Sequence, residues 1–366
     1  MQCLVAIKRS IILNMEIGIL TFHWATNYGA ILQAYCLQEY LIALGHEASI
    51  INYKPKKYDF SWFNFIRHPG LLKTIGRQLT NHKKERLLIP FRTKYLKTTK
   101  RYYSLTEFGP EINNYDVLIS GSDQVLNPYF TMHGEDGTPT SVYWLKSGKE
   151  TAKRIGYAVS FGCEIYPEKA LSIASTWSNG FDAIGVREKT GLYILEQIGY
   201  EGKKNIVPDP TILIGRELFR KLGISIPTQK DNYTCVYMLR HEIRIKGDVK
   251  YIDDNHKPLA MEQWIQTIIN AKQLITNSYH GTIMAIIAHV PFAVLLETGS
   301  DRGMNDRFYT LLTKIGVKDR LSTTIDETLS VLQRPMDFAK LDIAISKYRI
   351  EGERYISDNI ITSKFV

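Results

Sequence analysis

The feature that most constrains the fold is a strand, turn and helix near the start of the chain. "IGILTF" (17–22) predicts a strand and "HWATNYG" (23–29) a polar turn. "AILQAYCLQEYLIALG" (30–45) predicts a helix, because its apolar residues recur at helical spacing and a glycine closes it. "EASIINY" (47–53) predicts the next strand. Such a βαβ unit implies a parallel sheet, whose ligands lie outside the carboxyl ends of its strands. We therefore expect the turn from His23 to Gly29 at a ligand-facing edge.

Further stretches repeat this design, with a strand that ends in a polar loop. Strands are predicted within "YDVLISGSDQVLNP" (115–128), "RIGYAVSFG" (154–162) and "FDAIGVREKTGLYILEQIGY" (181–200), and "NIVPDPTILI" (205–214) closes this half. Together with the opening strand, these give four polar loops that can share one edge of a sheet.

A second, smaller half begins near Ile214. Its predicted strands are "YTCVYML", "VKYI", "LITNS" and "FAVLL", the last strand expected, and its predicted helices are "MEQWIQTIINAK" and "TIMAIIAH". Between Leu239 and Val249 the chain is too short for a crossover helix, since parallel connections need about a dozen residues or more. We therefore expect either that this half lacks one βα unit or that the strands before and after this connection pair antiparallel.

Composition excludes several classes of protein. A hydrophobic share of 44% and a charged share of 23% are typical of a soluble globular protein, and 366 residues fit two domains. The apolar leader is interrupted by Lys8 and Arg9, so neither a signal peptide nor a spanning helix is expected. The four cysteines form no C-x-x-C pair, which indicates a reducing, cytoplasmic setting without a zinc site or a disulfide framework.

Positive charge is concentrated in one segment. The formal net charge is +9, but 53–103 holds 14 Lys or Arg against 2 acids, which leaves the rest of the chain at −3. Aromatic residues such as Trp62 and Phe63 lie among these bases. The mixture suits a membrane interface with anionic head groups or a polyanionic partner. A solvated helical excursion whose aromatics pack on the domain explains it equally well.

His280 is the first candidate for chemistry. Ser278 is a suitable N-cap, so Tyr279, His280 and Gly281 would form a first helical turn, where unpaired N–H groups attract anions. A histidine there can act as an acid near neutral pH or contact a phosphate. Taken alone, the residue is better explained as a histidine bonded to a carbonyl at a domain seam.

Other candidates follow predicted strands or open predicted helices. Arg187 can bind a carboxylate or phosphate through two parallel bonds, or can belong to a charged pair that caps a helix. The remaining candidates are Asn27, Tyr28 and Gly29 at a helix start, Ser122 and Asp123 in a turn, and Arg302, Asn305 and Arg307. The last three would form an anion cradle, although a surface turn with solvated charges is the commoner local interpretation. No G-x-G-x-x-G, G-x-S-x-G, H-E-x-x-H or Walker A pattern occurs.

Taken together, these stretches resemble the polysaccharide pyruvyl transferase family. The matching pieces are collinear from Met15 to Val317: "NYGAILQAYCLQEYL", "YDVLISGSDQVLNP", "IGYAVSFG", "GVREKTG", "VPDPTILI", "NAKQLITNSYHGTIMAII", "VPFAV" and "NDRFYTLLTKIGV". The resemblance implies an α/β, GT-B-like fold of two Rossmann-like lobes across a cleft. The expected units are an extension outside the fold (1–14), a first lobe (15–213) with a basic excursion (53–103), a smaller second lobe (214–335) and a C-terminal helix packing across the lobes (336–366).

The resemblance also implies an activity, the transfer of the pyruvyl group of phosphoenolpyruvate to a sugar as a ketal during capsule or exopolysaccharide synthesis. It implies His280 and Arg187 as catalytic residues, without metal or cofactor. Donor-binding residues would be Ser278, Tyr279, Gly281, Thr282, Arg302, Asn305 and Arg307, and acceptor-binding residues Asn27, Tyr28, Gly29, Ser122 and Asp123. Some branches carry Arg-x-His where this chain has Ser278-Tyr279-His280, so Arg302 or Arg307 would replace the missing cation. Leu126 stands where relatives often have Trp.

The sequence is compatible with more than one partner and more than one function. A lipid-diphosphate-linked sugar acceptor would suit peripheral contact of 53–103 with an anionic membrane, at its cytoplasmic face, and no nucleic acid is expected. One alternative keeps the fold but makes the chain a nucleotide-sugar glycosyltransferase of GT-B type. The other is a non-enzymatic protein that binds a polyanion through 53–103.

Overall fold

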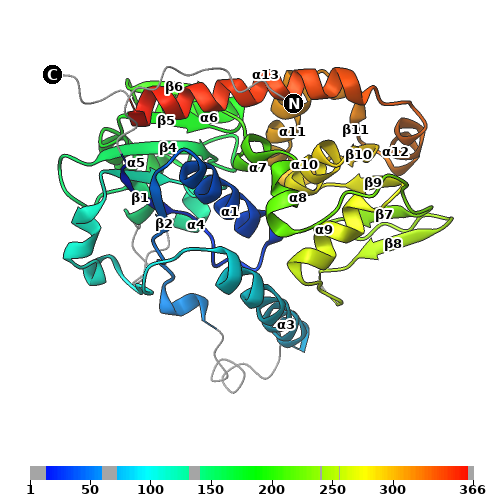
Figure 1. Ribbon diagram of the computed structural model, residues 1–366, viewed down its shortest axis with the longest axis horizontal. Coiled ribbons are helices and arrows are strands. Elements are labelled where there is room, and N and C mark those ends of the chain that lie inside the picture. Colours follow the sequence, from blue (N-terminus) through cyan, green and yellow to red (C-terminus); the bar gives the residue numbers. More distant parts are fainter. Residues whose placement is uncertain (1–13, 60–71, 132–140, 240, 255, 362–366) are drawn as a thin grey trace.

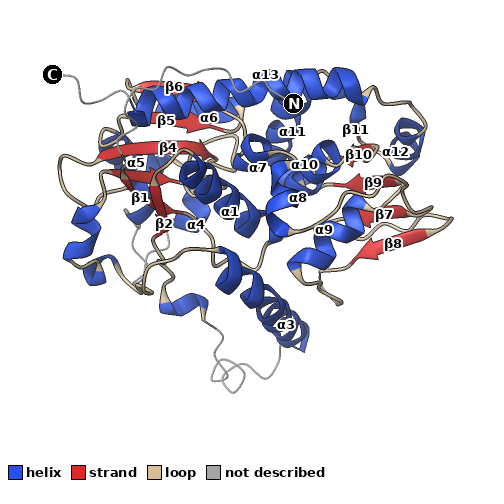
Figure 2. Cartoon of the chain, viewed as in Figure 1, coloured by secondary structure: helices blue, strands red, loops and turns tan. Residues whose placement is uncertain are grey.

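The computed structural model describes residues 14–59, 72–131, 141–239, 241–254 and 256–361. The expected extension (1–14, apart from Asn14) and both Trp62 and Phe63 lie outside these ranges. Two sheets with flanking helices lie side by side along the longest axis (Figures 1 and 2). The predicted α/β class with two Rossmann-like lobes is confirmed.

The first lobe is built on a six-stranded sheet in the order β2-β1-β3-β4-β5-β6, and every pairing is parallel. Its strands are β1 Glu16–Leu20, β2 Glu47–Ile50, β3 Val117–Ser120, β4 Lys153–Val159, β5 Ala183–Val186 and β6 Lys203–Ile206. All residues of β3 and β5 are buried, as expected for a parallel sheet covered on both faces. β1, β3, β4 and β5 are neighbours, so their loops share one edge, as predicted.

The second lobe is built on a five-stranded sheet in the order β11-β10-β9-β7-β8, again parallel throughout. Its strands are β7 Thr234–Tyr237, β8 Val249–Ile252, β9 Gln273–Thr276, β10 Phe292–Leu295 and β11 Leu321–Ser322. The antiparallel alternative for β7 and β8 is therefore wrong. Ile243 and Ile245, on the connection, pack in the apolar cluster of Val236, so irregular chain covers the sheet where a helix usually would. β11 was not expected, because two residues leave no periodic pattern.

Helices cover both sheets. The α-helices are α1 Tyr28–Ala43, α3 Leu72–Tyr95, α4 Pro128–Thr131, α5 Glu168–Ser178, α6 Lys189–Gln197, α7 Pro210–Ile214, α8 Glu217–Leu222, α9 Met261–Ile269, α10 Tyr279–Ile287, α11 Asp306–Lys314, α12 Ile325–Leu332 and α13 Phe338–Ile356. Short 3-10 turns are η1 Lys56–Tyr58, η2 Leu105–Glu107, η3 Pro110–Asn114, η4 Val142–Trp144, η5 Gly299–Asn305 and η6 Lys318–Arg320, and a π-turn, η7 Ser357–Ile361, ends the described chain. The predicted N-caps are confirmed, since Asn27 accepts from Ala30 N and Ser278 from Gly281 N.

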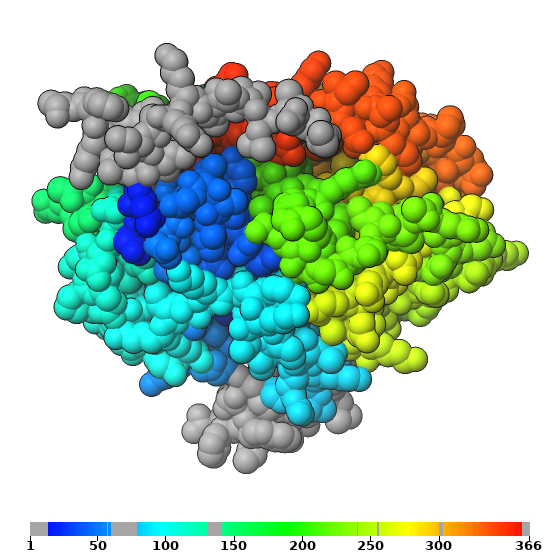
Figure 3. Space-filling model, viewed as in Figure 1, coloured from blue at the N-terminus to red at the C-terminus, as the bar shows by residue number. Residues whose placement is uncertain are grey.

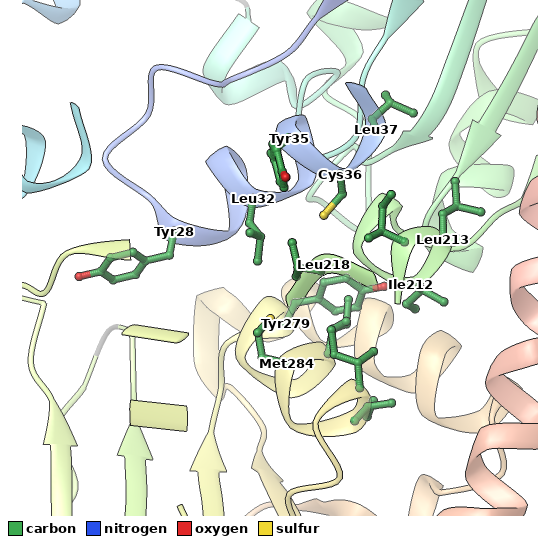
Figure 4. Close-up of a cluster of buried hydrophobic side chains, with 14 of the residues drawn as sticks. Tyr28, Leu32, Tyr35, Cys36, Leu37, Ile212, Leu213, Leu218, Tyr279 and Met284 are labelled. Atoms are coloured by element: carbon green, nitrogen blue, oxygen red, sulfur yellow. The ribbon is translucent and has the colours of Figure 1, made fainter. Parts of the chain in front are cut away.

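The two lobes meet along α1. The ring of Tyr28 stacks on Trp264 of α9 with centroids 5.0 Å apart, and its hydroxyl donates to Leu259 O at 2.8 Å and accepts from Leu259 N at 2.9 Å. Figure 4 shows Tyr279 of α10 in the same apolar junction, among side chains of α7 and α8 and below α1. Burial of this seam removes apolar surface of both lobes from water, which holds them together.

Within the basic segment (53–103), α3 packs partly on the lobes and partly faces solvent. Leu88 and Phe91 are buried in the core, and the cyan surface of α3 abuts the yellow residues around α9 (Figure 3). Lys84 is also buried, 2.8 Å from Asp254 of the second lobe. Among the described residues, no helix has the length and apolarity needed to cross a bilayer. Cys36, Cys163 and Cys235 are free thiols.

The C-terminal helix α13 contacts both lobes. Tyr355 donates to Gly156 O in the first lobe at 2.9 Å, and Glu351 pairs with Lys314 of α11 at 2.9 Å. Gly352 allows this approach, because an added Cβ would lie 2.6 Å from Pro208 Cγ and 2.8 Å from Tyr157 Oη.

We expect Gly352→Ala to lower the free energy of unfolding by about 1–3 kcal/mol, because its methyl group would overfill the contact. Helix propensity alone would predict the opposite change, because alanine is favoured over glycine inside a helix. Urea denaturation measures the change, with Ser346→Ala, at an exposed position of α13, as the control expected to stay within about 0.5 kcal/mol of wild type. Equal stability of Gly352→Ala and wild type would contradict the close packing.

Candidate active site

A buried carboxylate, that of Asp209, lies at the centre of the candidate site. The residue follows β6 between Pro208 and Pro210, and it is fully buried. Its Oδ1 caps α7 by accepting from Thr211 N at 3.0 Å and from Thr211 Oγ1 at 2.7 Å. The extended backbone before α7 aims the second oxygen at the seam between the lobes.

Oδ2 of Asp209 brings three distant stretches together. It accepts from Ser122 Oγ at 3.1 Å and from Arg187 Nη1 at 3.2 Å, and it lies 3.3 Å from His280 Nε2. Ser122 and Arg187 follow β3 and β5 of the first lobe, whereas His280 opens α10 of the second. The site is therefore assembled from both lobes.

Charge explains the ionisation of Asp209. Burial alone would raise the pKa of this carboxyl, but His280 and Arg187 beside it hold the pKa below its usual range. The carboxylate is thus charged across the physiological range. Its Oδ2 faces His280 Nε2 where the two lobes meet.

Arg187 is enclosed by carboxylates. Its side chain is fully buried, with Nη2 3.4 Å from Asp123 Oδ1 and Nε 3.8 Å from Glu188 Oε2, and its guanidinium lies 4.7 Å from the Tyr279 ring centre. Burial alone would lower the pKa of Arg187, but Asp123, Asp209 and Glu188 raise it. In this arrangement its fork binds protein carboxylates, so the expected direct contact with a substrate anion stays a prediction.

His280 belongs to the first turn of α10, and its side chain lies against the first turn of α1. His280 is 7% exposed, and its ring meets Tyr279 edge to face at 5.6 Å. On the other side lies Gly29 in the first turn of α1, where an added Cβ would collide with His280 Nδ1. Gly29 therefore makes room for the imidazole, although the sequence had suggested it for contact with an acceptor.

The expected donor-binding residues divide into two groups. Ser278 Oγ accepts from Gly281 N, and Thr282 Oγ1 donates to Ser278 O, so both hydroxyls hold the start of α10. The Asn305 side chain bonds the backbone of Glu297. Arg307, by contrast, is buried beside the site, 5.8 Å from the Tyr279 ring centre. The side chain of Arg302 lies outside the described part of the structure.

Some of the expected acceptor-binding residues lie in the Asp209 network and others lie outside it. Ser122 and Asp123 lie in the Asp209 network, and Asp123 has a left-handed φ of 83°, which Asp tolerates better than most residues. Tyr28 is instead committed to the seam with Leu259. Asn27 is an exposed cap.

The turn after β1 is only partly ligand-facing. His23 is buried, with Nδ1 3.1 Å from Thr21 O and Nε2 3.0 Å from the side-chain amide of Asn52. Burial lowers the pKa of His23 to about 4, so its ring is neutral. This histidine supports the loop, and Gly29 at the other end of the turn reaches the site.

A small cavity between the lobes lies next to this network. Its lining comes from loops after β3, β4 and β5, from the start of α6, and from η5 and α11: Gln124, Ser160, Gly162, Cys163, Glu188, Thr190, Gly303, Met304 and Arg307. Glu188 is 4% exposed, and burial raises its pKa despite the opposing effect of Arg187. The cavity thus combines a cation, amide and hydroxyl groups, and an acid that holds its proton more tightly than usual.

Sequence reasoning missed Asp209 and Glu188 as site residues. The available signals were their places after β6 and β5, at the ligand-facing edge of a parallel sheet. Of the described residues, one group places possible metal ligands within 4.8 Å of one another, namely Glu242, Asp253 and His256. It lies in the second lobe outside this network, and Asp253 and Glu242 already pair with His256 and Arg244.

The comparison with protein families agrees with the resemblance in sequence. A family model described as polysaccharide pyruvyl transferase matches residues 27–297. No curated protein matches the chain. Similar solved structures include an uncharacterized protein from Klebsiella pneumoniae (12% identity, 81% of this chain and 96% of that chain, TM-score 0.40). A UDP-GlcNAc 2-epimerase from Neisseria meningitidis is also similar (7% identity, 92% and 93%, TM-score 0.43).

We expect Asp209→Asn to lower the free energy of unfolding by about 3 kcal/mol at pH 7, because it leaves Arg187 with one buried carboxylate fewer. The native pKa lies below the ordinary 3.8, so the stability from Asp209 is complete above that value and is lost as pH falls below it. The difference between wild type and variant should therefore narrow in acid. Urea titrations from pH 7 to pH 3, with exposed Asp326→Asn as control, measure this. A difference that widened in acid would rule out the charged assignment.

Proposed function

Because the chain belongs to the polysaccharide pyruvyl transferase family, we propose that it moves the pyruvyl group of phosphoenolpyruvate to a sugar, closes a cyclic ketal across two hydroxyls and releases phosphate. The observation that carries this proposal is the family match, whose range includes Ser122, Arg187, Asp209 and His280. The contacts of Asp209 with the other three support it, because they place a histidine and its charged partner where the lobes meet.

The reaction sets clear demands on the site. The methylene carbon of the donor gains a proton and the two sugar hydroxyls each lose one, while phosphate departs as hydrogen phosphate. Acid and base groups are therefore needed together, and the imidazole of His280 beside Asp209 can take up and release a proton. Arg307 lines the cavity and can balance the charge of phosphate or carboxylate. Arg187 fixes Asp123 and Asp209, and the chemistry requires no metal or redox cofactor.

With phosphoenolpyruvate and a lipid-linked sugar, wild type should release phosphate and yield a product heavier by one pyruvyl ketal. His280→Ala should lower kcat by about 10²–10⁴-fold, the usual contribution of an acid or base group. Phosphate release and mass spectrometry measure both. His256→Ala, at an exposed histidine, is the control and should keep its rate. Full activity of His280→Ala would remove this histidine from the mechanism.

The acceptor is proposed to be a sugar on a lipid diphosphate, met at an anionic membrane surface. The outer face of α3 supports this, because Leu79 and Ile89 are exposed along with Lys83, Arg86 and Lys94. Spacings of three and four residues place most of them on one side of the helix. Apolar and basic side chains on one exposed face suit a membrane interface.

We expect a variant with Lys83→Glu, Arg86→Glu and Lys94→Glu to bind anionic vesicles at least about tenfold more weakly, since each base near such a surface contributes about 1 kcal/mol. Lys84 is kept, because it pairs with Asp254 between the lobes. Co-sedimentation at low and high salt measures binding. The matched control carries Lys272→Glu, Lys340→Glu and Lys347→Glu at other exposed positions. Equal binding of both variants would exclude α3 as the contact.

A further inference from the structure

The contacts of Glu188 with other residues do not explain why this acidic side chain is buried. Glu188 follows β5 and precedes α6, and its side chain is 6% exposed. Within the described residues, its Oε2 accepts no hydrogen bond, and the Nε of Arg187 lies 3.8 Å away, beyond hydrogen-bonding distance. Burying an acid without full compensation costs stability. Such a group calls for a reason beyond the local fold.

The inter-lobe cavity beside Glu188 offers a reason for its burial. It lines the inter-lobe cavity together with Arg307 and Gln124, whereas neither His280 nor Arg187 is among the lining residues. Gln124 and Met304, also in the lining, approach each other across the seam, with Gln124 Nε2 3.7 Å from Met304 Sδ. A cation and an acid from opposite lobes thus face one space little larger than a water molecule, so it can admit only one end of an anionic substrate.

Burial, more than the charges around Glu188, favours the protonated form of its carboxyl group. Burial raises its pKa most and Asp306 raises it further, while Arg187, Arg307 and a hydrogen bond from Ser160 oppose the increase. Cys163, Tyr279 and Tyr348 also lie in its field, and burial raises the pKa of each, so they are neutral neighbours. The net direction is upward, which places this acid closer to neutral pH than an ordinary glutamate.

We propose that Glu188 is the catalytic acid that delivers a proton to the methylene carbon of phosphoenolpyruvate. This assignment rests on the proposed function and gives His280 the complementary task. It adds a second proton-transfer group, on the opposite lobe from His280.

The steps balance as follows. The O–H bond of Glu188 breaks, and the electron pair of the donor double bond forms the new C–H bond. One sugar oxygen adds to the central carbon and its proton passes to His280. The bond from that carbon to the phosphate oxygen breaks, and phosphate leaves with the proton from His280. The second sugar oxygen closes the ketal, and its proton returns to the Glu188 carboxylate, so both residues end as they began.

The test compares wild type with Glu188→Gln, Glu188→Asp and the control Glu196→Gln, which changes an exposed glutamate on α6. Ketal formation is followed by mass spectrometry, kcat is measured against pH, and donor binding is measured as a melting-temperature shift with phosphoenolpyruvate. Glu188→Gln should lose about 10²–10⁴-fold in kcat and keep the donor-induced shift. Glu188→Asp should regain part of the rate, and Glu196→Gln should match wild type.

The pH profile separates a catalytic role from a structural one. Because the protonated acid is the active form, wild-type kcat should fall as pH rises through the Glu188 pKa, and this fall should be absent in Glu188→Gln. If wild type makes the ketal and Glu188→Gln keeps its rate within about fivefold or keeps the alkaline fall, Glu188 is not the acid. If wild type makes no ketal from phosphoenolpyruvate, the proposed function fails and this assignment fails with it.

Discussion

The shared carboxylate of Asp209 is the interaction on which the site depends. A fully buried charge is costly unless it is paired and hydrogen-bonded, and here Thr211, Ser122, Arg187 and His280 satisfy it together. Each partner comes from a different loop or helix start. The need to satisfy one buried anion therefore fixes the loops after β3 and β5 against the first turn of α10.

The seam between the lobes follows from that constraint. His280 reaches Asp209 with α10 packed against α1, and Gly29 lacks the side chain that would block this approach. Tyr28, the neighbouring residue, stacks on Trp264 and bonds Leu259, which holds the lobes at that separation. Beside this packed seam the loops leave a small cavity, so a polar space with Glu188 and Arg307 adjoins a nearly closed network.

The structure also changes the interpretation of charge. From the sequence, Arg187 looked like a residue that binds a substrate anion, but three carboxylates surround it. Arg307, whose local pattern was more typical of a solvated surface turn, is buried beside the cavity. Similarly, Lys84 belongs to the densest run of bases yet is withdrawn into an ion pair between the lobes. Residue type gave the sign of each charge, and packing determined what it meets.

The sequence by itself determined most of the fold and the places where the site could form. Strand periodicity, the caps at Asn27 and Ser278 and the polar loops are local patterns that need only neighbouring residues, and collinear motifs identified the family. Only the tertiary structure decided the parallel pairing of β7 with β8, the central place of Asp209 and the position of Glu188 at the cavity. These depend on contacts such as Ser122 with Asp209, 87 residues apart. Burial and compensation of charge act between segments that meet in space, and no local pattern records which segments those are.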